Sequence, residues 1–182
     1  MVKIKLVAML LSVSCLCLPF FVFAEKIKVD APAPFFRAVS GDDAVLTLDD
    51  IKGKVAVIFY ETKEAKEVNR LLKNELNIFY EKLTKAEKKN VIRIAVIDCR
   101  GVIFLGAWKL ELRENSRKEG IVVYGDWDGN MYSSYCIEEN LNNFLIIDRE
   151  GIVRYFRAGK VPASEIARIK DLLKKLMWSS GK

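Results

Sequence analysis

Glu64 and Glu67 are the first pair of side chains whose types and spacing could do chemistry. Apolar residues recur at three- and four-residue spacing along this segment, so both glutamates are predicted on one face of a helix, in its first turn. Paired carboxylates can act as general acid and base when burial raises the pKa of one of them. Lys63 and Lys66 beside them favour a structural role, in which the glutamates complement the helix dipole.

Cys99 and Cys136 are the second candidate pair. Cys99 follows a predicted strand, and Cys136 precedes a predicted loop at the same end of the sheet, so we expect the two side chains to be neighbours. Three alternatives stay open from the sequence: a structural disulfide, two thiols without a bridge, and a displaced redox pair. A bridge across this long loop is expected to stabilise the fold by about 4 kcal/mol.

Asp126, Asp128 and Asn130 offer oxygens at alternate positions, as calcium-binding loops do. Met131 occupies the position where such a loop needs glycine, and Ile137 the position of its bidentate glutamate. A β-turn between a strand and a helix explains the same residues. The sequence therefore predicts no metal site here, and no other pattern in it calls for a cofactor.

Composition excludes several classes of activity. The 182 residues include no histidine, which removes Ser-His-Asp and Cys-His catalysis and histidine-ligated zinc or haem. The net charge is +6, but basic residues alternate with acidic ones along the chain. This distribution is typical of a mixed, solvated surface and argues against a nucleic-acid partner.

The elements that position these candidates follow from hydrophobic periodicity. Val55 to Tyr60 and Val91 to Ile97 are apolar, β-branched runs typical of buried strands. The amphipathic segment 64–83 between them is predicted to be a helix, which gives a parallel βαβ unit with a right-handed crossover.

The second half of the chain predicts a hairpin and flanking helices. A helix over 102–119, ended by Gly120, precedes a short strand over 121–125. Residues 144–147 and 152–156 are strands separated by a four-residue turn, so they must form an antiparallel hairpin. A helix over 162–178 closes the chain. The sequence therefore predicts one α/β domain with a central mixed sheet flanked by helices.

The N-terminal segment predicts export. Lys3 and Lys5 precede the uncharged run Leu6 to Ala24, which ends in small residues suited to cleavage. We expect a signal peptide over residues 1–24, a folded domain over 25–182, and a periplasmic or secreted protein. The alternative is an N-terminal anchor, because an uncleaved Leu6 to Ala24 run approaches the length of a membrane span.

Two stretches carry a resemblance to a known family. The stretch from Leu48 to Tyr60, LDDIKGKVAVIFY, and the stretch from Phe144 to Val153, FLIIDREGIV, resemble the corresponding segments of the TlpA-like and peroxiredoxin (redoxin) branch of the thioredoxin-like superfamily. Gly106-Ala107-Trp108, the hairpin and the ending from Asp171 to Leu176 resemble those of the periplasmic YtfJ-type proteins of this superfamily. The resemblance covers nearly all of residues 25–182 and implies a thioredoxin-like fold.

The redox residues of that family are missing. Glu64-Ala65-Lys66-Glu67 stands where active members carry Cys-x-x-Cys, at a helix start that lowers the pKa of the first thiol. Asn142 stands where the family has a cis-proline, and a cis bond before a non-proline residue costs about 2.5–4 kcal/mol, so a trans loop is expected. The resemblance thus implies a degenerate redox site and no catalytic residues at these positions.

Three functions are compatible with this sequence. The first is a non-catalytic binding or accessory module, whose partner is a protein or a small ligand. The second is a thiol-disulfide oxidoreductase or antioxidant protein that uses Cys99 and Cys136. The third is a membrane-tethered interaction domain held by an uncleaved Leu6 to Ala24 run, and membrane contact is expected only in that case.

Overall fold

The computed structural model describes residues 27–62 and 64–178. The predicted signal peptide and its cleavage site lie outside these residues. None of the helices in the described ranges is both long and apolar enough to cross a membrane.

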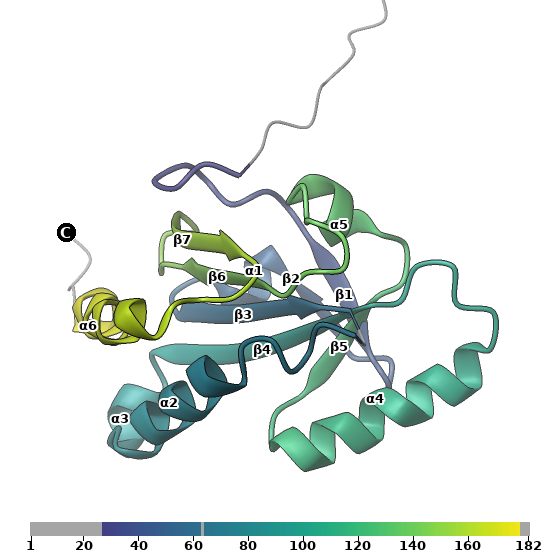
Figure 1. Ribbon diagram of the computed structural model, residues 1–182, viewed down its shortest axis with the longest axis horizontal. Coiled ribbons are helices and arrows are strands. Elements are labelled where there is room, and N and C mark those ends of the chain that lie inside the picture. Colours follow the sequence, from purple (N-terminus) through teal and green to yellow (C-terminus); the bar gives the residue numbers. More distant parts are fainter. Residues whose placement is uncertain (1–26, 63, 179–182) are drawn as a thin grey trace, which may run out of the picture.

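A seven-stranded mixed sheet forms the centre of the molecule (Figure 1). Three adjacent strands run parallel, and the remaining strands pair antiparallel at both sides of them. The predicted mixed sheet and hairpin are therefore confirmed. In chain order the strands are β1 (Arg37–Ser40), β2 (Val45–Thr47), β3 (Val55–Glu61), β4 (Val91–Asp98), β5 (Val123–Asp126), β6 (Asn143–Ile147) and β7 (Val153–Ala158). They lie side by side in the order β2-β1-β5-β4-β3-β6-β7.

Helices cover both faces of the sheet. The chain steps from β3 to β4 to β5 in one direction, so right-handed crossovers place both intervening helices on the same face, where the C-terminal helix also packs. A short helix and the N-terminal residues cover the opposite face. The helices are α1 (Leu48–Ile51), α2 (Arg70–Glu81), α3 (Lys85–Lys88), α4 (Leu105–Glu119), α5 (Asn130–Ser134) and α6 (Ala163–Trp178).

The strand β3 divides the hydrophobic core into two. Its alternate residues Ala56, Ile58 and Tyr60 pack on the α5 face, while Val57 and Phe59 pack beneath α2 and α6. Every residue of β3 is buried, as the continuous apolar run predicts. The strand ends in Glu61, a buried carboxylate that its apolar sequence does not lead one to expect.

Several predicted boundaries are wrong. The helix expected from Glu64 begins only at Arg70, and the helix expected from Val102 begins at Leu105. The charged stretch after α2 ends that helix as predicted but also forms α3, whose Thr84 and Glu87 cap each other reciprocally. The strand β1, which pairs with both β2 and β5, was not predicted from the sequence.

An N-terminal segment, residues 30–33, lies along the beginning of β7. Backbone hydrogen bonds join the amide of Asp30 to the carbonyl of Val153 (2.7 Å) and the amide of Val153 to the carbonyl of Ala31 (3.0 Å). The carboxylate of Asp30 also accepts a hydrogen bond from Arg154 at 2.6 Å. The outer strand of the sheet is thus covered where it starts.

Candidate functional site

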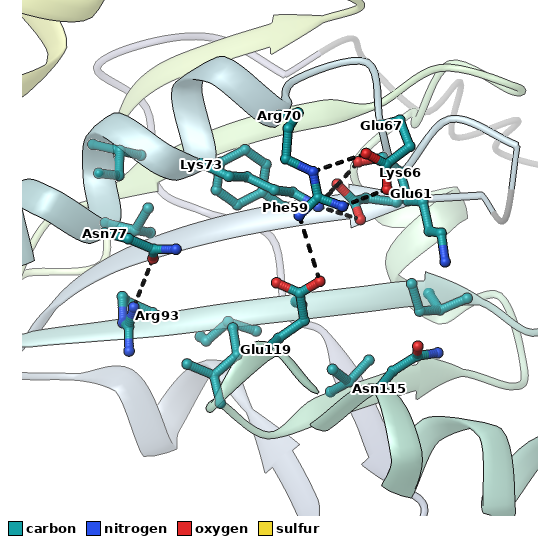
Figure 2. Close-up of a pocket in the computed structure, with 17 residues that line it drawn as sticks. Phe59, Glu61, Lys66, Glu67, Arg70, Lys73, Asn77, Arg93, Asn115 and Glu119 are labelled. Carbon is teal, nitrogen blue, oxygen red and sulfur yellow. Dashed lines mark hydrogen bonds and ion pairs between the residues drawn. The ribbon is translucent and has the colours of Figure 1, made fainter. Parts of the chain in front are cut away.

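Glu61 is the centre of a buried polar network at the end of β3. Its side chain is 3% exposed, and both carboxylate oxygens lie close to Nζ of Lys73 on α2, at 2.7 Å and 2.9 Å (Figure 2). The side-chain amide of Asn142 also donates to the carboxylate. Lys73 donates further to the carbonyl of Lys66 (3.2 Å) and lies 5.4 Å from the ring centre of Phe59.

Burial controls the titration of Glu61. Removal from water raises the pKa of its carboxyl above the usual value, while the ammonium of Lys73 and the amide of Asn142 act in the opposite direction. Among the glutamates that the structure describes at this end of β3, Glu61 is the buried one, and the pKa of its carboxyl is raised. The burial that raises the pKa of a carboxyl is therefore found at Glu61 and not at the exposed pair predicted from the sequence.

Asn142 and Asn69 connect three loops above this carboxylate. The side-chain amide of Asn69 donates to Oδ1 of Asn142 (2.7 Å) and to the backbone carbonyl of Gly159 (3.0 Å). Its Oδ1 accepts from the backbone amide of Val161 (2.8 Å). Both asparagines are fully or almost fully buried. The position that the resemblance assigns to a cis-proline is thus a hydrogen-bonding centre, and no cis peptide bond occurs in the described ranges.

The predicted helix face of Glu64 and Glu67 does not exist. Residues 64–69 form turns instead of a helix. Bonds between residues three apart join the amide of Ala65 to the carbonyl of Thr62 (3.2 Å) and the amide of Val68 to the carbonyl of Ala65 (3.1 Å). Both glutamates are exposed.

Glu67 is held in an ion pair. Nε of Arg70 donates to its carboxylate at 2.8 Å, and a second guanidinium nitrogen donates to the other oxygen. This bidentate contact lowers the pKa of Glu67, opposite to the shift that a general acid at neutral pH requires. The structural interpretation therefore fits Glu67 better than the catalytic one, although its partner is Arg70 and not a helix dipole.

Cys99 and Cys136 are not bridged, and the sheet lies between their surroundings. Cys99 continues the alternation of Ala95 along β4 and packs beneath α4 on the same face as Leu112. Cys136 lies between Tyr135 and Ile137, which pack in the core of the opposite face. Because the residues on either side of Cys136 pack on the face opposite to Cys99, the structure does not favour the expectation that the two side chains are neighbours.

The two thiols also differ in their surroundings. Cys99 is 1% exposed, and its burial raises the pKa of the thiol to about 12. Cys136 is partly exposed and adopts a left-handed backbone conformation with φ of 44°. A buried thiol with a raised pKa carries almost no thiolate at neutral pH, so Cys99 is inert as a nucleophile.

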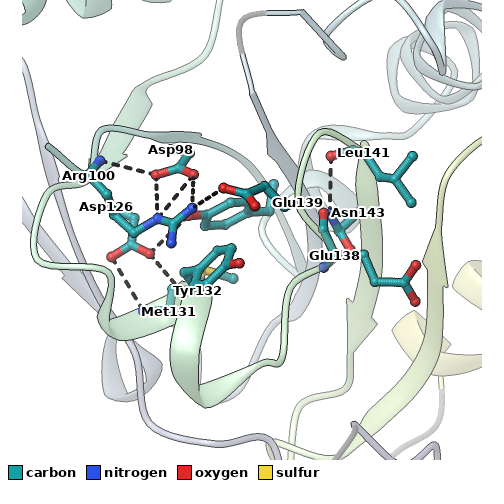
Figure 3. A network of polar contacts seen from close by, with 10 residues as sticks. Asp98, Arg100, Asp126, Met131, Tyr132, Glu138, Glu139, Leu141 and Asn143 are labelled. Carbon is teal, nitrogen blue, oxygen red and sulfur yellow. Dashed lines mark hydrogen bonds and ion pairs between the residues drawn. The ribbon is translucent and has the colours of Figure 1, made fainter. Parts of the chain in front are cut away.

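Asp126, Asp128 and Asn130 form the connection between β5 and α5, which confirms the turn interpretation. The carboxylate of Asp126 accepts from the amides of Met131 (3.3 Å) and Tyr132 (2.8 Å), as Figure 3 shows. Asp128 accepts from the amide of Asn130 at 3.0 Å. Within the described ranges, no three acidic or cysteine side chains gather as metal ligands would.

A second polar cluster lies beside this turn. Arg100 makes a two-pronged ion pair with Asp98, with Nε and a terminal nitrogen donating at 2.9 Å and 2.7 Å, and its guanidinium stacks 3.2 Å from the ring centre of Tyr132 (Figure 3). Tyr60 donates to Asp126 at 3.1 Å from the core beneath. These bonds fasten α5 to the ends of β4 and β5, which is a structural role.

A groove opens between α2 and α4, beside Glu61. Its water-accessible volume is about 80 Å³. Apolar side chains of β3, β4 and β5 form its floor, and charged side chains of the two helices and of Arg93 form its rim (Figure 2). The groove joins the buried network to solvent.

Sequence reasoning missed Glu61, Asn69 and Lys73. One signal was available, because a single acidic residue ends a seven-residue strand that is otherwise continuously apolar. A buried carboxylate at such a point needs a partner, and Lys73 on the following helix is a suitable one. Nothing local to Asn69 indicates its contacts, which reach residues 73 to 92 positions away.

No protein-family model matches the chain, and no curated protein matches its sequence. Solved structures do resemble it. The thioredoxin domain of a thiol-disulfide oxidoreductase from Bacteroides vulgatus superposes with a TM-score of 0.58 at 15% identity, covering 81% of this chain and 99% of that one. An exposed lipoprotein thioredoxin from Streptococcus pneumoniae gives 0.54 at 18% identity, covering 76% and 99%.

A redoxin is also among the similar structures. The reduced 2-Cys peroxiredoxin of Plasmodium vivax superposes with a TM-score of 0.53 at 21% identity, covering 80% of this chain and 96% of the other. At these identities the likeness concerns the fold and not the activity. With its parallel βαβ unit, its antiparallel hairpin and its helices on both faces of the sheet, the chain has a thioredoxin-like fold.

Proposed function

We propose that this chain is an exported thioredoxin-fold protein of the YtfJ type that performs no thiol chemistry and acts as a binding or accessory module. The observation that carries the proposal is the network of Glu61, Lys73, Asn142 and Asn69 at the edge where thiol-disulfide oxidoreductases of this fold hold their redox site. The chain keeps the scaffold and builds a closed set of hydrogen bonds in place of a reactive dithiol.

The chemistry of thiol exchange supports the same conclusion. The reaction needs an accessible thiolate that attacks a disulfide sulfur. The stretch from Glu61 to Asn69 contains no cysteine. Cys99 is buried with a raised pKa and is not bridged to Cys136, so it is poorly suited to attack a disulfide. This arrangement also argues against the oxidoreductase alternative.

An insulin-reduction assay tests the proposal. With dithiothreitol as reductant, we expect the full chain to precipitate insulin no faster than dithiothreitol alone. The matched variant Glu64→Cys with Glu67→Cys restores a dithiol at the family position. We expect it to react measurably but slowly, because the turn at 64–69 supplies no helix start and Asn142 alters the opposing loop. Reduction by the unmodified chain at the rate of an ordinary thioredoxin would refute the proposal.

A further inference from the structure

The beginning of α4 carries an exposed apolar prong, formed by residues 103–107 and Leu110. Ile103 and Phe104 are 86% and 75% exposed, and Leu105 and Leu110 are about half exposed. Residues 101–108 contain no charged side chain, although charged residues make up 30% of the chain. Large apolar side chains gathered in water mark a contact surface more often than a monomer's ordinary surface does.

A groove on another part of the surface has apolar walls. It lies between α2, α3 and α6 and holds about 580 Å³, within the range of about 300–1,000 Å³ typical of concave binding sites. Phe79 and Leu83 line it and are partly buried against the core. Ile78 of α2 and Trp178 of α6 also line it, and they are 50% and 55% exposed. This α2–α6 groove can therefore take up apolar side chains of a partner.

The prong and the α2–α6 groove lie at opposite ends of the molecule. Figure 1 shows the beginning of α4 at one end of the longest axis, and α3 and α6 at the other. The prong therefore cannot fill the groove of its own chain. A second copy placed end to end with the first can bring the two surfaces together.

Acids outnumber cations around the prong. Arg100, just before the uncharged run, faces both Asp98 at 2.7 Å and Glu139 at 3.5 Å. Two further cations of α4 pair with acids of the turn between β1 and β2. Residues 98–114 and the acids paired with them contain three cations and six acids in total. The surroundings of the prong thus carry a surplus of negative charge.

Lysines outnumber acids around the α2–α6 groove. Its lining and residues 85–89 of the α3 region together contain six lysines and three acids. Among these lysines, Lys82, Lys85 and Lys89 are exposed and pair with no carboxylate of the described residues. The surplus is positive and opposite in sign to that around the prong, so the two surfaces are complementary in charge as well as in shape.

We propose that the prong of one copy inserts into the α2–α6 groove of a second copy, so that the protein associates head to tail. Phe104 and its neighbours would leave water against Ile78 and Trp178, and the acids around the prong would face the lysines of the groove. Because the two surfaces differ, the contact is heterologous and can repeat along a row of copies. This inference goes beyond the binding role proposed above and does not depend on it.

Sedimentation velocity of the full chain at a series of concentrations tests the association. A contact made by a few side chains is smaller than a standard interface of about 800 Å² per partner, so we expect a Kd of about 10 μM to about 1 mM. The average mass should rise past that of a dimer with concentration. It should fall when salt is raised from about 0.05 M to about 0.5 M, because salt screens the charges.

Two single substitutions separate the partner surfaces. Phe104→Ser alters the prong and Ile78→Glu alters the groove, and each should weaken association by at least about tenfold. Leu71→Ser is the matched control, because Leu71 is a 54% exposed apolar residue of α2 outside both surfaces, and it should change nothing. All three positions are exposed, and circular dichroism reports whether each variant keeps its fold.

Mixing the two variants gives the sharpest result. Each variant keeps one intact surface, Phe104→Ser the groove and Ile78→Glu the prong. We therefore expect neither to associate alone, and an equimolar mixture to form dimers with one copy of each and nothing larger. A mixture that stays monomeric would overturn the proposal.

Other outcomes would also refute it. They are an average mass that does not change with concentration, association that survives both substitutions in one chain, and association that Phe104→Ser abolishes but Ile78→Glu leaves intact. The last result would indicate contact between two prongs. None of these outcomes bears on the insulin assay, so head-to-tail association and the loss of thiol chemistry fail separately.

Discussion

Glu61 is a carboxyl whose burial and partners compete. Because removal from water raises its pKa above the ordinary 4.5, the folded protein holds more protons than the unfolded chain between these two pKa values. The free energy of unfolding must then fall as the pH rises through that interval. This slope has the opposite sign to that of a carboxyl whose pKa is lowered on folding.

The slope can be isolated by substitution. We expect the free energy of unfolding of the unmodified chain, minus that of Glu61→Gln, to decrease as the pH rises from about 4 to about 7. Glu67→Gln is the control, because Arg70 lowers the pKa of Glu67. The difference in the free energy of unfolding between the unmodified chain and Glu67→Gln should therefore shrink as the pH falls below the ordinary glutamate pKa of 4.5. Urea denaturation at a series of pH values measures both. A difference for Glu61→Gln that is flat or increases with pH would contradict the assigned direction.

At the scale of elements, the late start of α2 follows from contacts made far along the chain. Asn69 precedes the helix, and its side chain bonds to Asn142, Gly159 and Val161 instead of capping the helix. The turn of residues 64–69 thereby connects α2 to the loops at both ends of the β6–β7 hairpin. One asparagine fixes the relative position of three segments.

Asn69→Ala should be costly for this reason. The substitution leaves the carbonyl of Gly159, the amide of Val161 and the side chain of Asn142 without their partner, and each unsatisfied buried group costs about 1–3 kcal/mol. We expect the free energy of unfolding to fall by about 3 kcal/mol in total. Asn115→Ala, on the partly exposed side of α4, should change it by less than about 0.5 kcal/mol. Equal effects of the two substitutions would show that the network contributes little.

These contacts also explain which elements were predictable. The strand β3, the β6–β7 hairpin and α6 are encoded by local periodicity, and the sequence predicts all three. The start of α2 depends on partners more than 70 residues away, so a local helical pattern extends it wrongly back to Glu64. The absence of cysteine between Glu61 and Asn69 was visible from the sequence, whereas the polar network at the end of β3 required the packing of β3, α2 and the hairpin.

At the scale of the whole molecule, the two cysteines differ in burial. We expect iodoacetamide to modify Cys136 in the folded protein at least about tenfold faster than Cys99, which is buried with a thiol pKa of about 12. Mass spectrometry of proteolytic peptides distinguishes the two sites, and Cys136→Ala provides the matched background. In urea the two rates should become similar. A peptide pair cross-linked through Cys99 and Cys136 in the untreated protein would contradict this arrangement.

The segment of residues 30–33 that lies along β7 has a consequence for solubility. An uncovered outer strand presents unpaired amides and carbonyls to which another chain can add, and this is a common route to aggregation. Here Asp30, Ala31 and Ala33 occupy the groups of Gly151 and Val153 that such a chain would use first. At the other border, β2 is only three residues long and offers a template too short for stable addition. Both borders of this sheet therefore discourage edge-to-edge association between copies of the protein.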